Sequence, residues 1–197
     1  MPLASILTAD DSGPPSQEAI NRLSAAYAIN AQRTTDQDAA YGIRQIVDIA
    51  LKALSPGIND TTTAVMSLDY LTAILIRLCG RGIESPCRYD DGELRVITRG
   101  ATFASMVELA FDQIRQNAGG SVAVLTRLVD ALHTLEGQTQ RPNRRVVLLH
   151  QAQALEEVIR RTIPASLDRE PVEARVKCQL ESLKATKAAM ETAPAHR

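Results

Sequence analysis

The side chains best suited to chemistry gather on one face of a helix predicted over residues 34–54. At about 100° per residue, four polar side chains fall on the same side of this helix: Tyr41, Arg44, Gln45 and Asp48. A guanidinium and a carboxylate four residues apart can bind a polar ligand or a neighbouring domain. They can equally form a surface ion pair worth about 0.2–0.5 kcal/mol, although Arg44 before Asp48 is the weaker order. This face is a candidate binding surface, with an ordinary solvated helix face as the alternative.

Two more oxygen-bearing side chains, Asn59 and Asp60, follow the Pro56-Gly57 turn that ends this helix. Both have structural roles available, Asn59 in the turn and Asp60 as the N-cap of the next helix. Their part in a binding site is therefore the second hypothesis for these residues. A hard-cation site that also includes Asp38 is disfavoured, because about 16 helical residues would separate Asp38 from the turn by roughly 24 Å.

Asp69 lies within the apolar helix that follows, where a buried carboxylate needs a partner. Arg44 or Arg115 can supply that partner, which would give a structural polar network. Glu108, Asp112 and Arg115 have the spacing of surface pairs within one helix. Arg115 is nevertheless kept among the candidate binding residues, together with the polar face of the helix over residues 34–54.

Motifs for cofactor binding and covalent catalysis are absent from the sequence. It contains neither a GxGxxG nor a GxxxxGK phosphate loop, and neither a GxSxG elbow nor an HExxH helix. The histidines and cysteines are scattered without metal-ligand spacing: His133, His150, His196, Cys79, Cys87 and Cys178. We therefore expect no metal and no cofactor, assign no catalytic residue, and interpret the cysteines as reduced thiols.

The bulk composition is that of an ordinary globular chain. At 197 residues it fits one domain, and 45% apolar with only 3% aromatic residues predicts a core of Leu, Ile, Val and Ala. A net charge of −1 gives no electrostatic support for binding nucleic acid or an anionic membrane. We expect no signal peptide at residues 1–7, which lack a basic flank, and the longest apolar run is well below the ~20 residues that span a bilayer. We expect a soluble, cytoplasmic polypeptide.

Hydrophobic periodicity predicts an all-α fold of about seven helices in a compact, bundle-like domain. The expected helices cover residues 16–31, 34–54, 60–78, 101–117, 121–135, 143–162 and 168–184. One small β-hairpin is expected near residues 87–97, around Asp91-Gly92. Residues 1–15 are interpreted as a linker without regular structure, residues 16–184 as the helical domain, and residues 185–197 as a frayed tail.

Local capping signals predict where several of these helices begin. Thr34 and Gln37 have the spacing of a capping box for the helix over residues 34–54. Asp60 is the predicted N-cap of the next helix, and Pro171 suits the first turn of the last one. Much of the polarity around the Pro56-Gly57 turn therefore has a structural explanation.

Two stretches of this chain resemble sequence signatures of a known protein family. The first runs over residues 37–60 and includes GIRQIVDIALKALSPGIND; the second is FDQIR at residues 111–115, after the Asp91-Gly92 hairpin. They resemble the signature of an uncharacterised bacterial family, the predicted membrane proteins called domain of unknown function 2254. The resemblance covers roughly residues 2–132, with Thr61 where the family usually has proline. It implies transmembrane helices N-terminal to this region in family members, and it transfers no activity.

The expected function is interaction rather than catalysis. The preferred hypothesis is a cytoplasmic module of a multi-pass membrane protein, membrane-associated where it is joined to the transmembrane region. It would pack on that region in the same or a separate chain, form homo-oligomers, or sense a small ligand through the Arg44/Asp48 face. A free-standing helical scaffold or regulator is the alternative. An enzyme using carboxylates for acid/base chemistry has less support, because no nucleophile or cofactor loop accompanies them.

Overall fold

The computed structural model describes residues 4–6, 14, 16–26, 38–83, 87–98, 100–139 and 141–191. Over these residues the chain forms seven helices and three short strands. The helices are α1 (Gln17–Ala26), α2 (Ala39–Leu54), α3 (Thr61–Gly80), α4 (Phe103–Asn117), α5 (Val122–Gln138), α6 (Pro142–Thr162) and α7 (Ser166–Glu191). The strands are β1 (Ala4–Ile6), β2 (Cys87–Asp90) and β3 (Glu93–Thr98). The predicted all-α class and the β-hairpin are confirmed.

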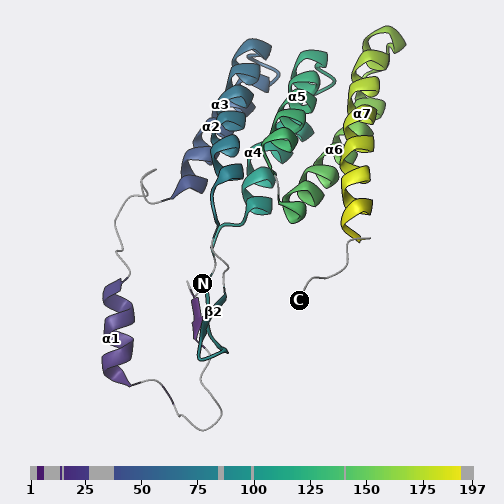
Figure 1. Cartoon of the computed structure of the whole chain (residues 1–197). Helices are drawn as coiled ribbons and strands as arrows, with labels where there is room; N and C mark the ends of the chain where they lie inside the picture. The colour runs from purple at the N-terminus through teal and green to yellow at the C-terminus, as the bar shows by residue number, and fades with distance from the viewer. Residues whose placement is uncertain are drawn as a thin grey trace.

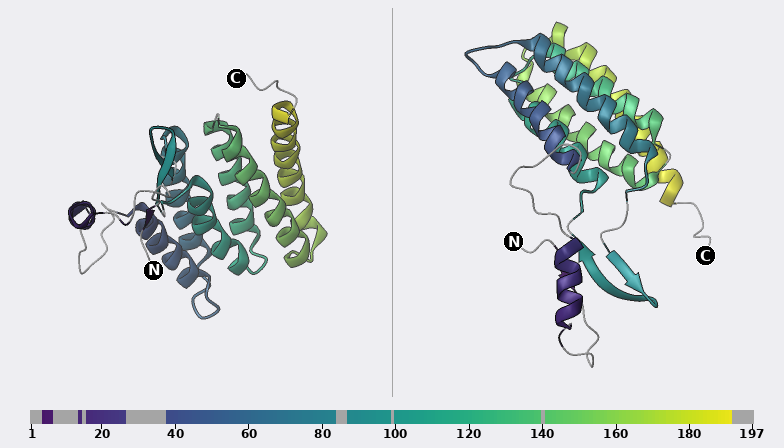
Figure 2. Two further views of the ribbon diagram at one scale, coloured as in Figure 1. Left: turned by 90° about the horizontal axis from the view of Figure 1, so that it is seen from below. Right: turned by 90° about the vertical axis from the view of Figure 1, so that its left-hand side faces the viewer.

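Helices α2 to α7 form an array of two layers (Figure 1). In one layer α4 packs between α2 and α6, and in the other α5 packs between α3 and α7. The array is open-ended, with α2 and α3 at one end and α6 and α7 at the other, as the left-hand view of Figure 2 shows. A stack of this kind resembles the packing of α-solenoids, in which each helix contacts mainly its neighbours.

The core between the two layers is aliphatic, as the composition predicts. Its largest fully buried side chains include a single aromatic residue: Phe111, Ile43, Leu68, Leu71, Leu75, Ile114, Leu125, Leu128, Leu132, Leu135, Leu148 and Leu155. On α2 the buried residues Ile43, Val47 and Ala50 recur at helical spacing, so this helix buries one face only. That burial directs the opposite, polar face of α2 outward and one flank toward α4.

Helix α2 begins at Asp38, whose Oδ1 accepts a hydrogen bond of 3.2 Å from the Tyr41 amide. The capping box predicted for Thr34 and Gln37 lies outside the described residues. Helix α3 begins at Asp60 as predicted, and Asp60 Oδ1 accepts from the Thr63 amide at 3.0 Å. The hydroxyl and amide of Thr63 lower the pKa of the Asp60 carboxyl, because both hydrogen bonds favour its charged form.

The turn between α2 and α3 depends on a left-handed residue. Asn59 has φ 48°, a conformation that Asn tolerates better than most side chains. Its amide donates to the Ser55 carbonyl at 2.9 Å, and the Asp60 amide donates to the Ala53 carbonyl at 2.8 Å. These bonds satisfy the last carbonyls of α2, so Asn59 and Asp60 have the structural roles that the sequence allowed them.

The β-hairpin is part of a three-stranded sheet. Asp91 and Gly92 both have positive φ, as a two-residue hairpin turn requires. Strand β1 pairs antiparallel with the free edge of β3, with Ala4 opposite Thr98. The prediction that residues 1–15 lack regular structure was therefore wrong for Ala4–Ile6, because a short apolar segment can satisfy the unpaired edge of β3.

The last helix differs from its prediction at both ends. It begins at Ser166, so Pro171 lies inside it rather than in its first turn. It also continues to Glu191, beyond residue 184, where the prediction ended the helical domain. The segment that follows residue 184 is rich in Ala, Lys, Met and Glu, which are good helix formers even without an apolar stripe. The proposed domain boundaries themselves stay predictions.

Candidate functional site

A polar cleft lies between α2 and α4. Its volume is about 280 Å³, and Arg44 is the residue of α2 that lines it. The remaining lining residues come from α4: Glu108, Leu109, Asp112, Gln113 and Gln116. Their spacing places them on successive turns of one face of α4. The cleft brings together parts of the two stretches that carry the family resemblance, GIRQ on α2 and FDQIR on α4.

The Asp112 carboxylate is held in place from two helices. Arg115 Nη2 donates to Asp112 Oδ1 at 3.1 Å, and Gln151 Nε2 of α6 donates to the same oxygen at 2.9 Å. Gln151 is buried, and the Arg115 side chain is only 15% exposed. Arg115 Nε is buried and has no hydrogen-bond partner among the described residues. These contacts fix the orientation of Asp112 at the edge of the cleft.

The other charged groups of the cleft are not paired. Neither Arg44 nor Glu108 makes a hydrogen bond or an ion pair in the described part of the chain, and Asp112 Oδ2 accepts from no described donor. Arg44 is half-buried, whereas Glu108 is exposed. The cleft therefore presents a guanidinium on its α2 side and carboxylate oxygens on its α4 side. This arrangement can bind a polar ligand, and its described lining contains no serine, threonine, cysteine or lysine side chain.

The remaining sequence-predicted site residues lie away from this cleft. Gln45 and Asp48 are exposed on the outer side of α2, and no ion pair joins Arg44 to Asp48. Tyr41 is half-buried one turn before the cleft. Asn59 and Asp60 lie past the far end of α2, roughly 15 Å away at 1.5 Å per residue from Arg44 to Leu54. Of the predicted residues, the structure thus groups Arg44 and Arg115 around Asp112.

The predicted site residues do not include the cleft residues of α4 or Gln151 of α6: Glu108, Leu109, Asp112, Gln113, Gln116 and Gln151. The spacing of Glu108 and Asp112 predicts surface pairs rather than a site. Asp112 and Gln113 do stand within the FDQIR string, which was the available signal. Nothing in the sequence indicated the hydrogen bond to Gln151, because it joins residues on α4 and α6 that lie 39 positions apart.

The proposed partners of Asp69 were wrong. Asp69 is not buried: its side chain is 42% exposed, at the surface between α3 and α5. It accepts a hydrogen bond from Arg127 of α5, rather than from Arg44 or Arg115. That hydrogen bond raises the pKa of the Arg127 guanidinium. A helical wheel of α3 shows which face Asp69 occupies but not which neighbouring helix packs there.

Arg144, near the start of α6, is the most deeply buried charged residue of the described chain. It is 3% exposed, and its guanidinium donates to the carbonyls of Leu78, Cys79 and Arg81 at 2.7–2.8 Å. It also lies 4.9 Å from the centre of the Phe103 ring. Arg144 thus caps the carboxyl end of α3 and joins it to α4 and α6, which is a structural role.

A second polar network joins α5 to α7. The buried Glu136 carboxylate accepts from Gln179 Nε2 at 2.5 Å and from Ser182 Oγ at 2.7 Å. Because a carboxylate only accepts, the Gln179 amide is oriented with Oε1 toward His133, whose Nδ1 donates across 2.9 Å. This chain of hydrogen bonds orients His133 at the surface. The buried polar groups of this network all have hydrogen-bond partners, so the network, like Arg144, stabilises the packing of the array.

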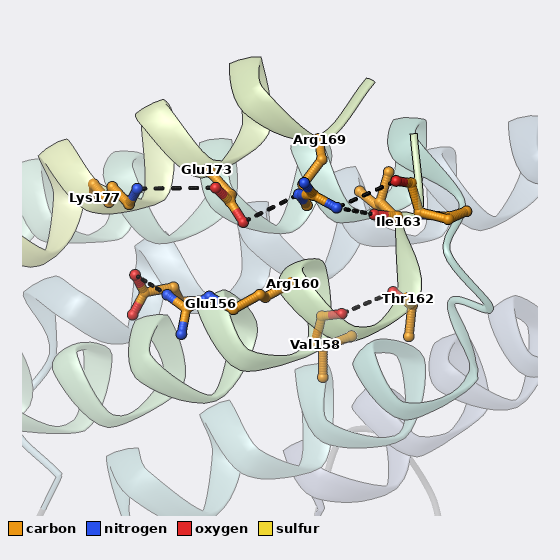
Figure 3. Close-up of polar contacts among 9 residues, drawn as sticks. Glu156, Val158, Arg160, Thr162, Ile163, Arg169, Glu173 and Lys177 are labelled. Atoms are coloured by element: carbon orange, nitrogen blue, oxygen red, sulfur yellow. Dashed lines mark hydrogen bonds and ion pairs between the residues drawn. The ribbon is translucent and has the colours of Figure 1, made fainter. Parts of the chain in front are cut away.

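The two ends of the array differ in polarity. Four exposed large hydrophobic side chains lie on the α2/α3 hairpin: Ile49, Ile58, Met66 and Tyr70. At the α6/α7 end, ion pairs cover the helix surfaces, Arg169–Glu173–Lys177 on α7 and Glu156–Arg160 on α6 (Figure 3). The α2/α3 end therefore exposes a group of large apolar side chains, beside the polar residues Gln45, Asp48 and Lys52 of α2, and we name it the apolar α2/α3 end. At the α6/α7 end the described residues expose one large hydrophobic side chain, Leu167, among charged ones.

Helix α3 also stands out by its length and composition. Among the described residues it is the one helix long and apolar enough to cross a membrane, although a third of its apolar window is buried inside the array. Leu68, Leu71 and Leu75 form its buried stripe. Length and composition alone do not separate a membrane span from a core helix.

Comparison with known proteins places these features in a family. The model of a family described as "Predicted membrane protein (DUF2254)" matches residues 1–134. Two similar proteins are the uncharacterized protein Rv1290c of Mycobacterium tuberculosis and the uncharacterized protein Mb1321c of Mycobacterium bovis. Each is 34% identical over 137 residues, which are 69% of this chain and 26% of the relative. The chain thus spans about a quarter of the length of these relatives. No solved structure matches it significantly.

Proposed function

Since the chain belongs to the DUF2254 family of predicted membrane proteins, we propose that its helical array is a docking module of such a protein. The array lies outside the bilayer, on the cytoplasmic side. Its apolar α2/α3 end packs against the membrane-spanning part of the family architecture, in the same chain or in a separate one. The role of the module is interaction rather than catalysis.

The observation that carries this proposal is the difference between the two ends of the array. Helical arrays need terminal units with a polar outer surface to stay in solution, and the α6/α7 end has one. The α2/α3 end instead exposes Ile49, Met66 and Tyr70. In the antiparallel hairpin Ile49 and Met66 stand at similar heights, eight and nine residues from Gly57. Exposed apolar groups that gather at one end of a molecule are typical of interaction surfaces.

Two further features support this location, one bearing on the position outside the bilayer and the other on the cytoplasmic side. Helix α3 has a buried stripe in contact with α2 and α5, which favours its interpretation as a core helix of the array. Cys79 and Cys178 carry free thiols, as is usual in a reducing compartment. Burial raises the pKa of the Cys79 thiol, so this cysteine is a packing residue rather than a reactive one.

A free-standing scaffold or regulator is the second candidate function. It uses the same apolar end, but with a second copy of the chain as the partner. The two candidates differ in what contacts Tyr70, which is 62% exposed at that end. They therefore make different products in one cross-linking experiment.

The experiment places a photo-cross-linking amino acid at position 70 in cells, with a control at position 177 on the charged α6/α7 end. We expect a product at position 70 that sediments with membranes and contains peptides of a membrane-spanning DUF2254 segment. A product of twice the chain mass of 21.4 kDa would support the scaffold instead. Absence of any product at position 70, or equal products at both positions, would contradict a docking role for this end.

A further inference from the structure

We propose that the cleft between α2 and α4 binds a small zwitterionic molecule, one that carries both a carboxylate and an ammonium group as a free amino acid does. The cleft presents one unpaired guanidinium and unpaired carboxylate oxygens on facing helices. Arg44 is the group for the ligand carboxylate, and Glu108 with Asp112 is the pair for the ammonium. This binding site is separate from the apolar α2/α3 end.

The α2 side of the cleft is suited to a carboxylate. Arg44 is half-buried on the flank of α2 that faces α4, where the buried stripe of Ile43 and Val47 holds the helix in place. A guanidinium offers two parallel N–H groups to a carboxylate, a geometry that gives both affinity and orientation. No described carboxylate occupies that fork, so its hydrogen-bonding capacity is available to a ligand.

The α4 side of the cleft is suited to an ammonium group. Arg115 and Gln151 both donate to Asp112 Oδ1, and this leaves Oδ2 as the available oxygen in a fixed orientation. Glu108 lies one turn earlier on the same face of α4 and is unpaired. An ammonium group has three N–H donors and no acceptor, so it can donate to both carboxylates at once.

The charge balance of the cleft favours a zwitterion over a plain anion or cation. Arg115 compensates the charge of Asp112, and the remaining pair, Arg44 and Glu108, sums to zero. A phosphate or a second carboxylate would meet Glu108 at short range, and a cation without a carboxylate would leave Arg44 unused. No group of three metal-ligating residues exists among the described residues. A neutral ligand with two separated charges is the chemical class that uses every group.

The size of the cleft limits the ligand further. Its volume of about 280 Å³ lies just below the roughly 300–1,000 Å³ of pockets for drug-sized molecules. Gln113 and Gln116 add carboxamide groups at its edge, and Leu109 adds an apolar surface. The cleft therefore fits a molecule with few heavy atoms, whose side chain contacts the two glutamines. A polar amino acid such as glutamine has this size and character.

The experiment measures binding to the whole chain by isothermal titration and by ligand-detected NMR. The probes are glycine, L-glutamine, L-glutamate and L-lysine. Each is compared with its Nα-acetyl derivative, which lacks the α-ammonium group, and with its α-carboxamide, which lacks the α-carboxylate. We expect at least one free amino acid to bind, and loss of either charged group to weaken its binding by about tenfold or more. Absence of binding by all four amino acids at about 10 mM, or equal binding of the N-acetyl derivative, would overturn the proposal.

Variants of the protein test the assignment of each side of the cleft. Arg44→Gln should weaken the binding of that amino acid by about tenfold or more, whereas Arg160→Gln, an exposed change on α6, should leave it unchanged. If Arg44→Gln does not fold, Glu108→Gln gives the same test on the opposite side, because Glu108 is exposed and unpaired. Unchanged affinity in a folded Arg44→Gln or Glu108→Gln variant would reject the assignment of that residue.

Discussion

Gln151 of α6 donates a hydrogen bond of 2.9 Å to Asp112 Oδ1 of α4, and this contact joins two neighbouring helices of one layer at the edge of the polar cleft. Gln151 is buried, and its acceptor is a carboxylate. A hydrogen bond to a charged group contributes more to stability than one between neutral groups. The pair therefore both orients Asp112 and stabilises the packing of α4 on α6.

The first prediction concerns a variant that lacks the Gln151 donor. Gln151→Leu keeps most of the side-chain volume but leaves Asp112 with Arg115 alone, so we expect the free energy of unfolding to fall by about 1–2 kcal/mol. Urea unfolding followed by circular dichroism measures the change. Gln153→Leu, an exposed position on the same helix, is the matched control and should change stability by less than about 0.5 kcal/mol. Equal effects of the two variants would contradict a role for the Gln151–Asp112 contact.

The second prediction concerns the buried cap at the end of α3. Arg144→Met keeps an apolar stem but leaves the carbonyls of Leu78, Cys79 and Arg81 without their donor. We expect a loss of about 3 kcal/mol or more in the free energy of unfolding, because buried acceptors without partners are costly. Guanidinium chloride unfolding checks it, with Arg160→Met as the exposed control. A loss below about 1 kcal/mol would show that water replaces the guanidinium.

Features set by neighbouring residues in the chain could be predicted from the sequence. Asp60 caps α3 because its side chain accepts from an amide three residues later, and Asp91-Gly92 forms the hairpin because both residues tolerate positive φ. The helical spacing of the apolar residues in α2 likewise predicts which of its side chains are buried. These interactions are local, and a residue type at a fixed spacing is enough to indicate them.

Features that depend on the packing of distant elements could not be predicted in the same way. Asp69 contacts Arg127 across 58 positions, and β1 pairs with β3 across 90 or more. No local pattern in the sequence distinguishes Arg144 from a surface arginine, although the structure buries it. A helical wheel places Arg44 on the polar face of α2 but does not identify α4 as its neighbour. The candidate site was therefore predicted only in part, through Arg44 and Arg115.

The third prediction separates the apolar α2/α3 end from ordinary surface. Met66 is 51% exposed there, and Leu167 is 85% exposed on α7 at the other end of the array. Either residue changed to Lys should alter the free energy of unfolding by no more than about 0.5 kcal/mol. Met66→Lys should also reduce membrane recovery of the chain in cell fractions at least about fivefold, because it places a charge in the proposed contact. Leu167→Lys should not.

The same fractionation has a clear contrary result. If Met66→Lys and Leu167→Lys leave the same share of the chain with membranes as the unmodified protein, the α2/α3 end does not mediate membrane attachment. If both variants lower it equally, the effect comes from added charge in general rather than from this end. Thermal unfolding of both variants confirms that a loss of attachment is not a loss of folding.

The fourth prediction follows from the N-cap of α3. The Thr63 hydroxyl and amide lower the pKa of Asp60 from its ordinary value of 3.8, so the folded state binds this proton less tightly than the unfolded state. The stabilisation from Asp60 is therefore present above about pH 3.8 and is lost as the pH falls through the lower folded-state pKa. Asp60→Asn keeps a capping oxygen but cannot titrate, so its urea midpoint should fall less between about pH 6 and pH 2.5 than that of the unmodified chain. Thr63→Val, which removes the hydroxyl donor while Asp60 remains, should reduce the same pH dependence in part. A midpoint that falls equally in all three proteins would mean that other carboxylates account for the acid sensitivity of the array.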